Sequence, residues 1–172
     1  DQMYVFNPMN DTWTPMGVIP EHKQTRGEIV GGVLYLFGGF NGEVSKQIDA
    51  YVISDSTWFY IGEMPIEISA NATAKHGDFI WLVGDYNKLS LLAVFNTKTL
   101  EIYYIKSNML GRRHAGAEIV GNNLYVYGGN RTSSGNILSS LIVADISKIE
   151  IMINTTAIND TPKMEKSKSE GN

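Results

Sequence analysis

Three short stretches of the sequence repeat one another at a long, nearly constant interval, and this repeat limits the possible folds more than any other feature. The stretches are Gly32–Gly39 (GVLYLFGG), Asp78–Asp85 (DFIWLVGD) and Asn122–Gly129 (NNLYVYGG). Each follows a turn, is rich in β-branched and aromatic residues and stops at a glycine, which is typical of a short strand. The intervals are 46 residues from Leu34 to Ile80 and 44 from Ile80 to Leu124. A period of this length with strand chemistry predicts a tandem array of β units.

A second landmark repeats in step with the first. A large residue on the expected fourth strand of each unit recurs as Trp13, Trp58, Ile102 and Ile151, at spacings of 45, 44 and 49. We therefore divide the chain into five parts. They are the second half of a unit (1–20), two complete units (21–65 and 66–109), a third complete unit (110–158) and a polar tail or linker (159–172).

Each complete unit is expected to contain four antiparallel strands. In the first, residues 25–30 and 33–37 form a hairpin around Gly31-Gly32, a polar loop follows at residues 40–47, and strands follow at 49–54 and 58–61. The second unit repeats this more loosely. In the third, the expected strands are 114–120, 124–127, 141–145 and 148–153. No stretch has a sustained helical period, so we expect an all-β chain.

Four antiparallel strands per unit, repeated in tandem, are typical of the blades of a β-propeller. The double glycines (Gly38-Gly39 and Gly128-Gly129), the downstream tryptophans (Trp13 and Trp58) and the opening Arg112-Arg113-His114-Ala115 resemble kelch repeats, and the resemblance extends to residue 159. The second unit departs from the pattern, because it has Gly84-Asp85 in place of the double glycine and Ile102 in place of the tryptophan. The fold class expected is an incomplete kelch-type propeller.

The expected blade count of three and a half leaves both ends of the array open. A propeller normally has four or more blades. Either the chain is a segment of a longer propeller, or the half blade at residues 3–16 pairs with another element, such as one from a second copy of the chain. Both ends would then expose strand edges and blade faces.

Composition narrows the function classes. The formal charge is −4, hydrophobic residues make up 43% and charged residues 19%, so no nucleic-acid partner is expected. The chain has no cysteine, which excludes disulfides and thiolate zinc sites. No membrane segment and no signal peptide are visible in this stretch. We expect no cofactor and no metal, and we favour the cytoplasm while leaving secretion open.

The loops that enter each unit and the loops that follow the double glycines should share one face, because antiparallel strands alternate direction. The predicted partner-binding residues on that face are His22, Lys23, Arg112, Arg113, His114, Asn130 and Arg131, with Phe40, Asn41, Asp85, Tyr86 and Asn87 beside them. Resemblance to kelch proteins implies a bound partner peptide there, with arginines reading acidic groups. Guanidinium groups suit this recognition because they offer a planar, bidentate fork to a carboxylate. The alternative is that Arg112 and Arg113 are solvated or structural.

Other polar residues are weaker candidates for sites. Glu28 and Glu118 hold equivalent places on first strands that a propeller would cover, either as acid/base groups or as structural carboxylates paired with Arg26 or the backbone. Three histidines, His22, His76 and His114, fall in different units, and His76 is expected on the opposite face, so a metal site is not predicted.

Five Asn-x-Ser/Thr sequons occur. Asn10, Asn71, Asn130 and Asn154 are candidates for N-glycosylation, and Asn159 is weakened by Pro162. The alternative is that an Asn-rich chain contains them by accident.

We interpret the chain as a protein-interaction module. Its partner would be another protein or peptide, and an acidic one would suit the arginines. No GxSxG or other catalytic constellation occurs. The alternatives are a segment of a propeller enzyme resembling galactose oxidase or a sugar epimerase, or a secreted glycoprotein propeller. The missing cysteine argues against the copper oxidase, which needs a thioether-forming cysteine.

Overall fold

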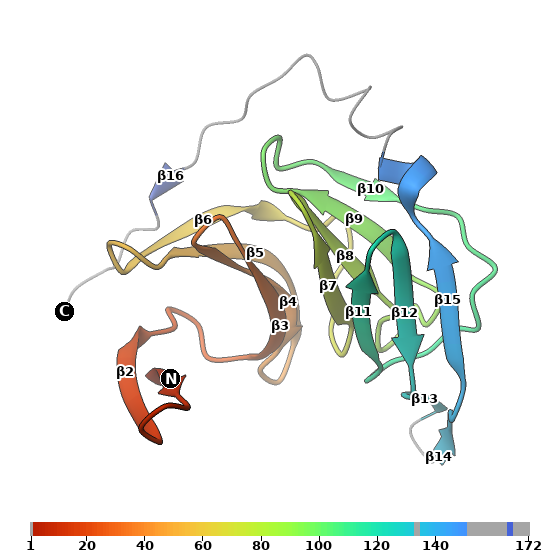
Figure 1. Cartoon of the computed structure of the whole chain (residues 1–172), viewed down its shortest axis with the longest axis horizontal. Helices are drawn as coiled ribbons and strands as arrows, with labels where there is room; N and C mark the ends of the chain where they lie inside the picture. Colours follow the sequence, from red (N-terminus) through yellow and green to blue (C-terminus); the bar gives the residue numbers. More distant parts are fainter. Residues whose placement is uncertain (1, 133–134, 151–164, 167–172) are drawn as a thin grey trace.

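The computed structural model describes residues 2–132, 135–150 and 165–166. Its strands form three antiparallel sheets that fan out side by side, with a two-stranded hairpin at the N-terminal end (Figure 1). We call the sheets first, second and third in chain order. This arrangement agrees with the all-β fold class expected from the repeat.

The strand bounds follow the predicted period closely. The N-terminal hairpin consists of β1 (Gln2–Asn7) and β2 (Thr12–Val18). The first sheet contains β3 (Gln24–Val30), β4 (Val33–Phe40), β5 (Val44–Val52) and β6 (Thr57–Glu63), with β16 (Glu165–Lys166) on the outer edge of β6. The second sheet contains β7 (Ala72–His76), β8 (Phe79–Val83), β9 (Leu92–Asn96) and β10 (Ile102–Tyr104). The third contains β11 (Gly116–Val120), β12 (Asn123–Tyr127) and β15 (Leu141–Asp145).

Register confirms the repeat residue by residue. Leu34 pairs with Ile29, Ile80 with Lys75 and Leu124 with Ile119, so each occupies the same place in its hairpin. The second landmark behaves in the same way. Trp13, Trp58 and Ile102 lie opposite Phe6, Tyr51 and Phe95, respectively. Equivalent residues of successive sheets can therefore be compared directly.

The second sheet is buried on both faces. In β8, Phe79, Trp81 and Val83 pack in a cluster with residues of the third sheet. The alternate residues of the same strand, Ile80 and Leu82, pack in a cluster with residues of the first sheet. Side chains alternate between faces along a strand, so a strand covered on both sides must be apolar throughout. This explains why residues 79–83 read FIWLV without a polar position.

Two departures from the expected strands have local causes. Residues 148–150 belong to a short helical turn (147–150) and not to a strand, so the prediction of a fourth strand at 148–153 is wrong over these residues. The Asp145 carboxylate accepts hydrogen bonds from the backbone N–H and the hydroxyl of Ser147, which starts the turn. Residue 151 lies outside the described residues. The loop expected at 40–47 is also shorter, because β4 and β5 extend into it.

Two further features were not anticipated. A small hairpin, β13 (Asn130–Thr132) and β14 (Gly135–Ile137), follows the double glycine of the third sheet. Most of the polar tail lies outside the described residues, but Glu165 and Lys166 pair with Tyr60 and Phe59 of β6. Within the described part of the chain, no helix is long and apolar enough to span a bilayer.

The burial of a side chain between two sheets predicts how much its truncation lowers the free energy of unfolding. Ile80 is fully buried between the first and second sheets, whereas Ile29 is 46% exposed. We expect Ile80→Ala to lower the free energy of unfolding by about 2–5 kcal/mol, because it removes buried methyl groups and leaves a cavity. Ile29→Ala should cost about 1 kcal/mol or less. Urea denaturation of both variants measures the difference, and equal costs would contradict this packing.

Candidate functional site

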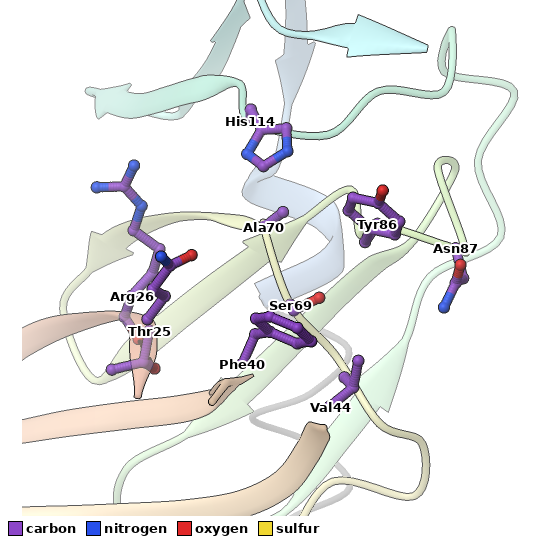
Figure 2. Close-up of a pocket in the computed structure, with 10 residues that line it drawn as sticks. Thr25, Arg26, Phe40, Val44, Ser69, Ala70, Tyr86, Asn87 and His114 are labelled. Carbon is purple, nitrogen blue, oxygen red and sulfur yellow. Dashed lines mark hydrogen bonds between the residues drawn. The ribbon is translucent and has the colours of Figure 1, made fainter. Parts of the chain in front are cut away.

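The innermost strands of the three sheets, β3, β7 and β11, lie next to one another (Figure 1). At the end where the chain enters these strands, residues of all three sheets surround a cavity of about 620 Å³ (Figure 2). The cavity is lined by Gln24, Thr25, Arg26, Phe40, Val44, Ser69, Ala70, Tyr86, Asn87 and His114. Segments that enter the sheets and loops that follow their second strands thus meet on one face, as the alternation of antiparallel strands requires.

Several lining residues are equivalent positions of the repeat. Gln24, Ala70 and His114 are separated by 46 and 44 residues, and Phe40 and Tyr86 by 46. The backbone N–H of His114 donates to the carbonyl of Ala70 at 2.8 Å, which joins two equivalent entry segments directly. The repeat therefore places residues from equivalent positions of successive sheets around the cavity.

Tyr86 is held in place by its neighbours. Its backbone N–H donates to the carbonyl of Ser69 at 2.9 Å. The guanidinium of Arg113 lies 3.9 Å from the centre of the Tyr86 ring and donates through Nη1 to the Tyr86 carbonyl at 3.2 Å. His114 meets the same ring edge-on, with 6.2 Å between ring centres. A cation over an aromatic face stabilises its orientation, so the aromatic wall of the cavity is preorganised.

The side chains lining the cavity that can carry a charge near neutral pH are basic. Arg26 is exposed, and among the described residues its guanidinium has no ion pair or hydrogen bond. His114 is also exposed. No carboxylate is among the lining residues. The cavity thus offers a cation, an imidazole and aromatic surface to a ligand.

Asp85 lies close by but is not available to a ligand. Its carboxylate is buried and accepts backbone hydrogen bonds from Ser69 at 2.7 Å, Asn87 at 2.9 Å and Lys88 at 2.8 Å. It stands where the other units have their second glycine. The departure of the second unit from the double-glycine pattern therefore has a structural reason, since the side chain organises the loop that carries Tyr86 and the entry segment of β7.

Two of the predicted cations are used within the fold. Arg112 is fully buried, and its guanidinium donates to the carbonyls of Leu110, Gly128 and Ser140 and to the Ser140 hydroxyl. Burial lowers the pKa of Arg112 from its usual value. The Lys23 side chain is 1% exposed, with Nζ 2.8 Å from a carboxylate oxygen of Asp49. Neither residue faces a ligand, so only the structural alternative suits Arg112.

The other predicted partner-binding residues lie in different places. His114 lines the cavity, and Arg113 supports its wall. Asn130 exchanges backbone hydrogen bonds with Arg113 at 3.0 Å, and its side-chain amide donates to the Thr132 carbonyl. His22 is exposed at the chain's entry to β3, while Arg131 lines a second hollow shared with Lys88 and Tyr104.

Sequence reasoning missed Arg26 as a residue that lines the cavity and treated it as an ion-pair partner for Glu28. The described residues contain no such pair. Glu28 is half-buried, whereas Glu118 is exposed and accepts a hydrogen bond from the backbone N–H of Ile119. The expected cover is therefore wrong at Glu118, because no described sheet follows the third one. The signal that could have identified Arg26 is its position near the start of the first strand of its unit, next to the segment that enters the sheet.

His76 is the histidine expected on the face opposite to His22 and His114. His76 lies in β7, where its Nδ1 is 2.7 Å from Oε2 of Glu150. The other oxygen of this carboxylate, Oε1, accepts the Trp81 indole N–H at 3.0 Å. In the described ranges no three metal-ligating side chains converge.

Of the sequons, Asn71 is 2% exposed, so its side chain is buried and not at the surface where a glycan would be attached. Asn10 is exposed in the β1–β2 turn, Asn130 is half-buried, and Asn154 lies outside the described residues.

Close packing at the end of β8 predicts a glycine requirement at one position. Gly84 has φ of +69°, and an added Cβ would collide with the carbonyl oxygen of Arg112. Gly77 has φ of +57°, and a Cβ added there would meet no atom within 4 Å. Gly77→Ala should cost about 1–2 kcal/mol from its left-handed backbone alone, and Gly84→Ala should cost clearly more. Thermal and urea unfolding compare them; similar losses would show that the entry segment of β11 moves freely.

The buried guanidinium predicts a second stability difference. Arg112→Met should lower the free energy of unfolding by at least about 2 kcal/mol, because several buried carbonyl groups lose their donor. Arg131→Met, at an exposed position, should change it by about 0.5 kcal/mol or less. Denaturation midpoints of the two variants test this, and a neutral Arg112→Met would mean that water replaces the guanidinium.

Known proteins provide independent comparisons. Residues 24–65 match the family model of the Kelch motif. Kelch-like protein 38 of Rattus norvegicus and its namesake in Mus musculus are each 29% identical over 139 residues, which cover 78% of this chain and 24% of theirs. The chain thus spans about a quarter of the length of these curated relatives.

The fold has a counterpart among solved structures. The structure of YjhT superposes with a TM-score of 0.59 at 17% sequence identity, over 75% of this chain and 50% of that one. The matched motif coincides with β3 to β6. The likeness to YjhT concerns the fold alone, while the motif and the relatives concern the sequence. Taken together with the three sheets in matching register, they show that the chain contains a Kelch motif, is similar to kelch-repeat proteins and has its sheets arranged as the blades of an incomplete β-propeller.

Proposed function

We propose that the chain is a protein-interaction module that binds an acidic peptide segment of another protein in the cavity at the entry face. The observation that carries this proposal is the guanidinium of Arg26, which pairs with no described residue and lies in a cavity whose described lining contains aromatic residues and no carboxylate. In this proposal, units 21–65, 66–109 and 110–158 are the blades that together supply the cavity.

Shape supports a peptide ligand. Phe40 and Tyr86 are 45% and 43% exposed, and the small residues Ser69 and Ala70 lie between them (Figure 2). Exposed aromatic rings on a rigid support are suited to binding an apolar side chain, since large contact area is gained with little loss of conformational freedom. The small residues leave room for the main chain of the ligand.

Charge supports an acidic ligand. Arg26 points from β3 toward the upper part of the cavity, and His114 lies across from it (Figure 2). A guanidinium without an internal partner binds a carboxylate by paired, charge-assisted hydrogen bonds. We therefore expect the partner segment to combine an aspartate or glutamate with an aromatic or aliphatic residue.

Peptide binding tests the proposal directly. An array of nine-residue peptides is prepared in two versions, with Asp/Glu in one and Asn/Gln in the other, and binding of the purified chain is quantified by fluorescence polarisation of the best sequences. The carboxylate version should bind more tightly. Arg26→Glu should weaken it about tenfold or more, because a charged hydrogen bond is lost and a repulsion is added.

Arg131→Glu is the matched control, since it changes the net charge equally at an exposed arginine outside the cavity. It should leave the affinity nearly unchanged, and both variants should keep the circular dichroism spectrum of the parent chain. Equal binding of the carboxylate and amide peptides, or equal effects of the two reversals, would reject the site.

A further inference from the structure

The turn between β4 and β5 contains the only Asn-Gly pair of the sequence, Asn41-Gly42. Both residues are exposed, and a Cβ built on Gly42 would meet no atom within 4 Å. Because glycine has no side chain to shield its backbone nitrogen, that nitrogen is open to approach from the preceding side chain. The turn therefore brings a carboxamide and an accessible backbone nitrogen together at the surface.

The hydrogen bonds of this turn favour attack on the Asn41 side chain. Among the described residues, the Gly42 N–H donates no hydrogen bond, so its nitrogen is not held elsewhere. The Asn41 Oδ1 accepts the Glu43 backbone N–H at 3.4 Å. Attack on a carbonyl carbon moves negative charge onto its oxygen, and a donor at that oxygen stabilises the charge. The Asn41 Nδ2 donates to the Glu21 carboxylate at 3.0 Å, an exposed contact that restrains the amide only weakly.

The equivalent position of the second unit provides a contrast. Asn87 lies 46 residues after Asn41 and is also exposed. It is followed by Lys88, whose backbone N–H donates to the buried Asp85 carboxylate at 2.8 Å. That nitrogen is therefore held by a hydrogen bond, and a long side chain shields it. Two asparagines at the same place in the repeat thus differ in the group that would have to react.

We propose that Asn41 is a site of spontaneous deamidation. The backbone nitrogen of Gly42 loses its proton and forms a bond to the side-chain carbonyl carbon of Asn41, and the bond from that carbon to Nδ2 breaks. The amide nitrogen takes up the proton and leaves as ammonia, so that a cyclic imide remains. Water then opens the ring at either carbonyl, which gives aspartate or isoaspartate. The net reaction consumes a water molecule and releases ammonia, so it needs no other reactant.

The conversion changes the charge beside the cavity at the entry face. Phe40 and Val44 flank the turn, and both line that cavity, whose described lining has no carboxylate. An aspartate in place of Asn41 adds a negative charge there, removes the donor to Glu21 and repels that carboxylate. An isoaspartate also lengthens the backbone next to Phe40. The effect on a ligand rests on the proposed peptide binding, whereas the conversion itself does not.

Peptide mapping tests the conversion. The full chain is incubated at neutral pH and digested with trypsin, which gives peptides 27–46 and 76–88, whose only asparagines are Asn41 and Asn87, respectively. Mass spectrometry follows the change from amide to acid in both peptides, and enzymatic methylation detects isoaspartate. Product should accumulate several times faster in peptide 27–46 than in peptide 76–88. Circular dichroism checks that the chain stays folded during the incubation.

Asn41→Gln is the matched control, because it keeps the side-chain amide but can react only through a larger ring. Peptide 27–46 of this variant should keep its mass throughout the incubation. An Asn41 that retains its amide for as long as Asn87 does overturns the proposal. Equal conversion of the parent chain and Asn41→Gln overturns it as well, since the reaction would then not pass through the Gly42 nitrogen.

The effect on binding is measured separately with Asn41→Asp, which reproduces one product. The best carboxylate peptide should bind this variant about threefold more weakly, as expected for a charge added at an exposed site. Asn122→Asp makes the same charge change in the exposed β11–β12 turn on the opposite face and should bind like the parent chain. If the parent chain binds no acidic peptide, the proposed function fails while the mapping still decides the conversion. If it binds, equal affinity of Asn41→Asp and the parent chain rejects the effect on the cavity.

Discussion

Apolar packing between successive sheets holds the other parts of this structure in place. A single sheet of four short strands has two apolar faces and cannot bury both by itself. In the second sheet, alternate residues of β8 pack toward each neighbour, and all five residues are buried. Because burial of apolar surface is the dominant favourable contribution to folding, the second sheet is stabilised mainly by the two sheets beside it, and the fan arrangement follows.

Polar groups complete this packing at the entry face. Arg112, Asp85 and Lys23 are all charged, and all are satisfied inside the fold by carbonyls, backbone N–H groups or a carboxylate. Each of these groups connects segments of its own unit, and Arg112 and Asp85 pair backbone polar groups that would otherwise be unsatisfied, which costs more than the bonds themselves contribute. Charge on this face is therefore mainly structural, and Arg26 differs because it lines the cavity and has no hydrogen bond or ion pair from its guanidinium among the described residues.

The repeat explains the position of the cavity. Residues at equivalent positions, such as Ala70 and His114, meet around the innermost strands because every sheet enters from the same face. The cavity thus arises from the geometry of the repeat, although different side chains line it in each sheet.

The repeat and most of the strands could be predicted from the amino-acid order alone, because their signals are local: alternating or continuous apolar runs and glycine turns specify β8 and its equivalents within a few residues. The helical turn at 147–150 could not, since Asp145 caps a short segment and Glu150 receives the Trp81 indole from another sheet. Which cations are available to a ligand is a property of the folded molecule, because burial depends on neighbours distant in the chain. Arg112 and Arg26 look alike as sequence letters, but one is enclosed by carbonyl groups from other segments and the other lines a cavity.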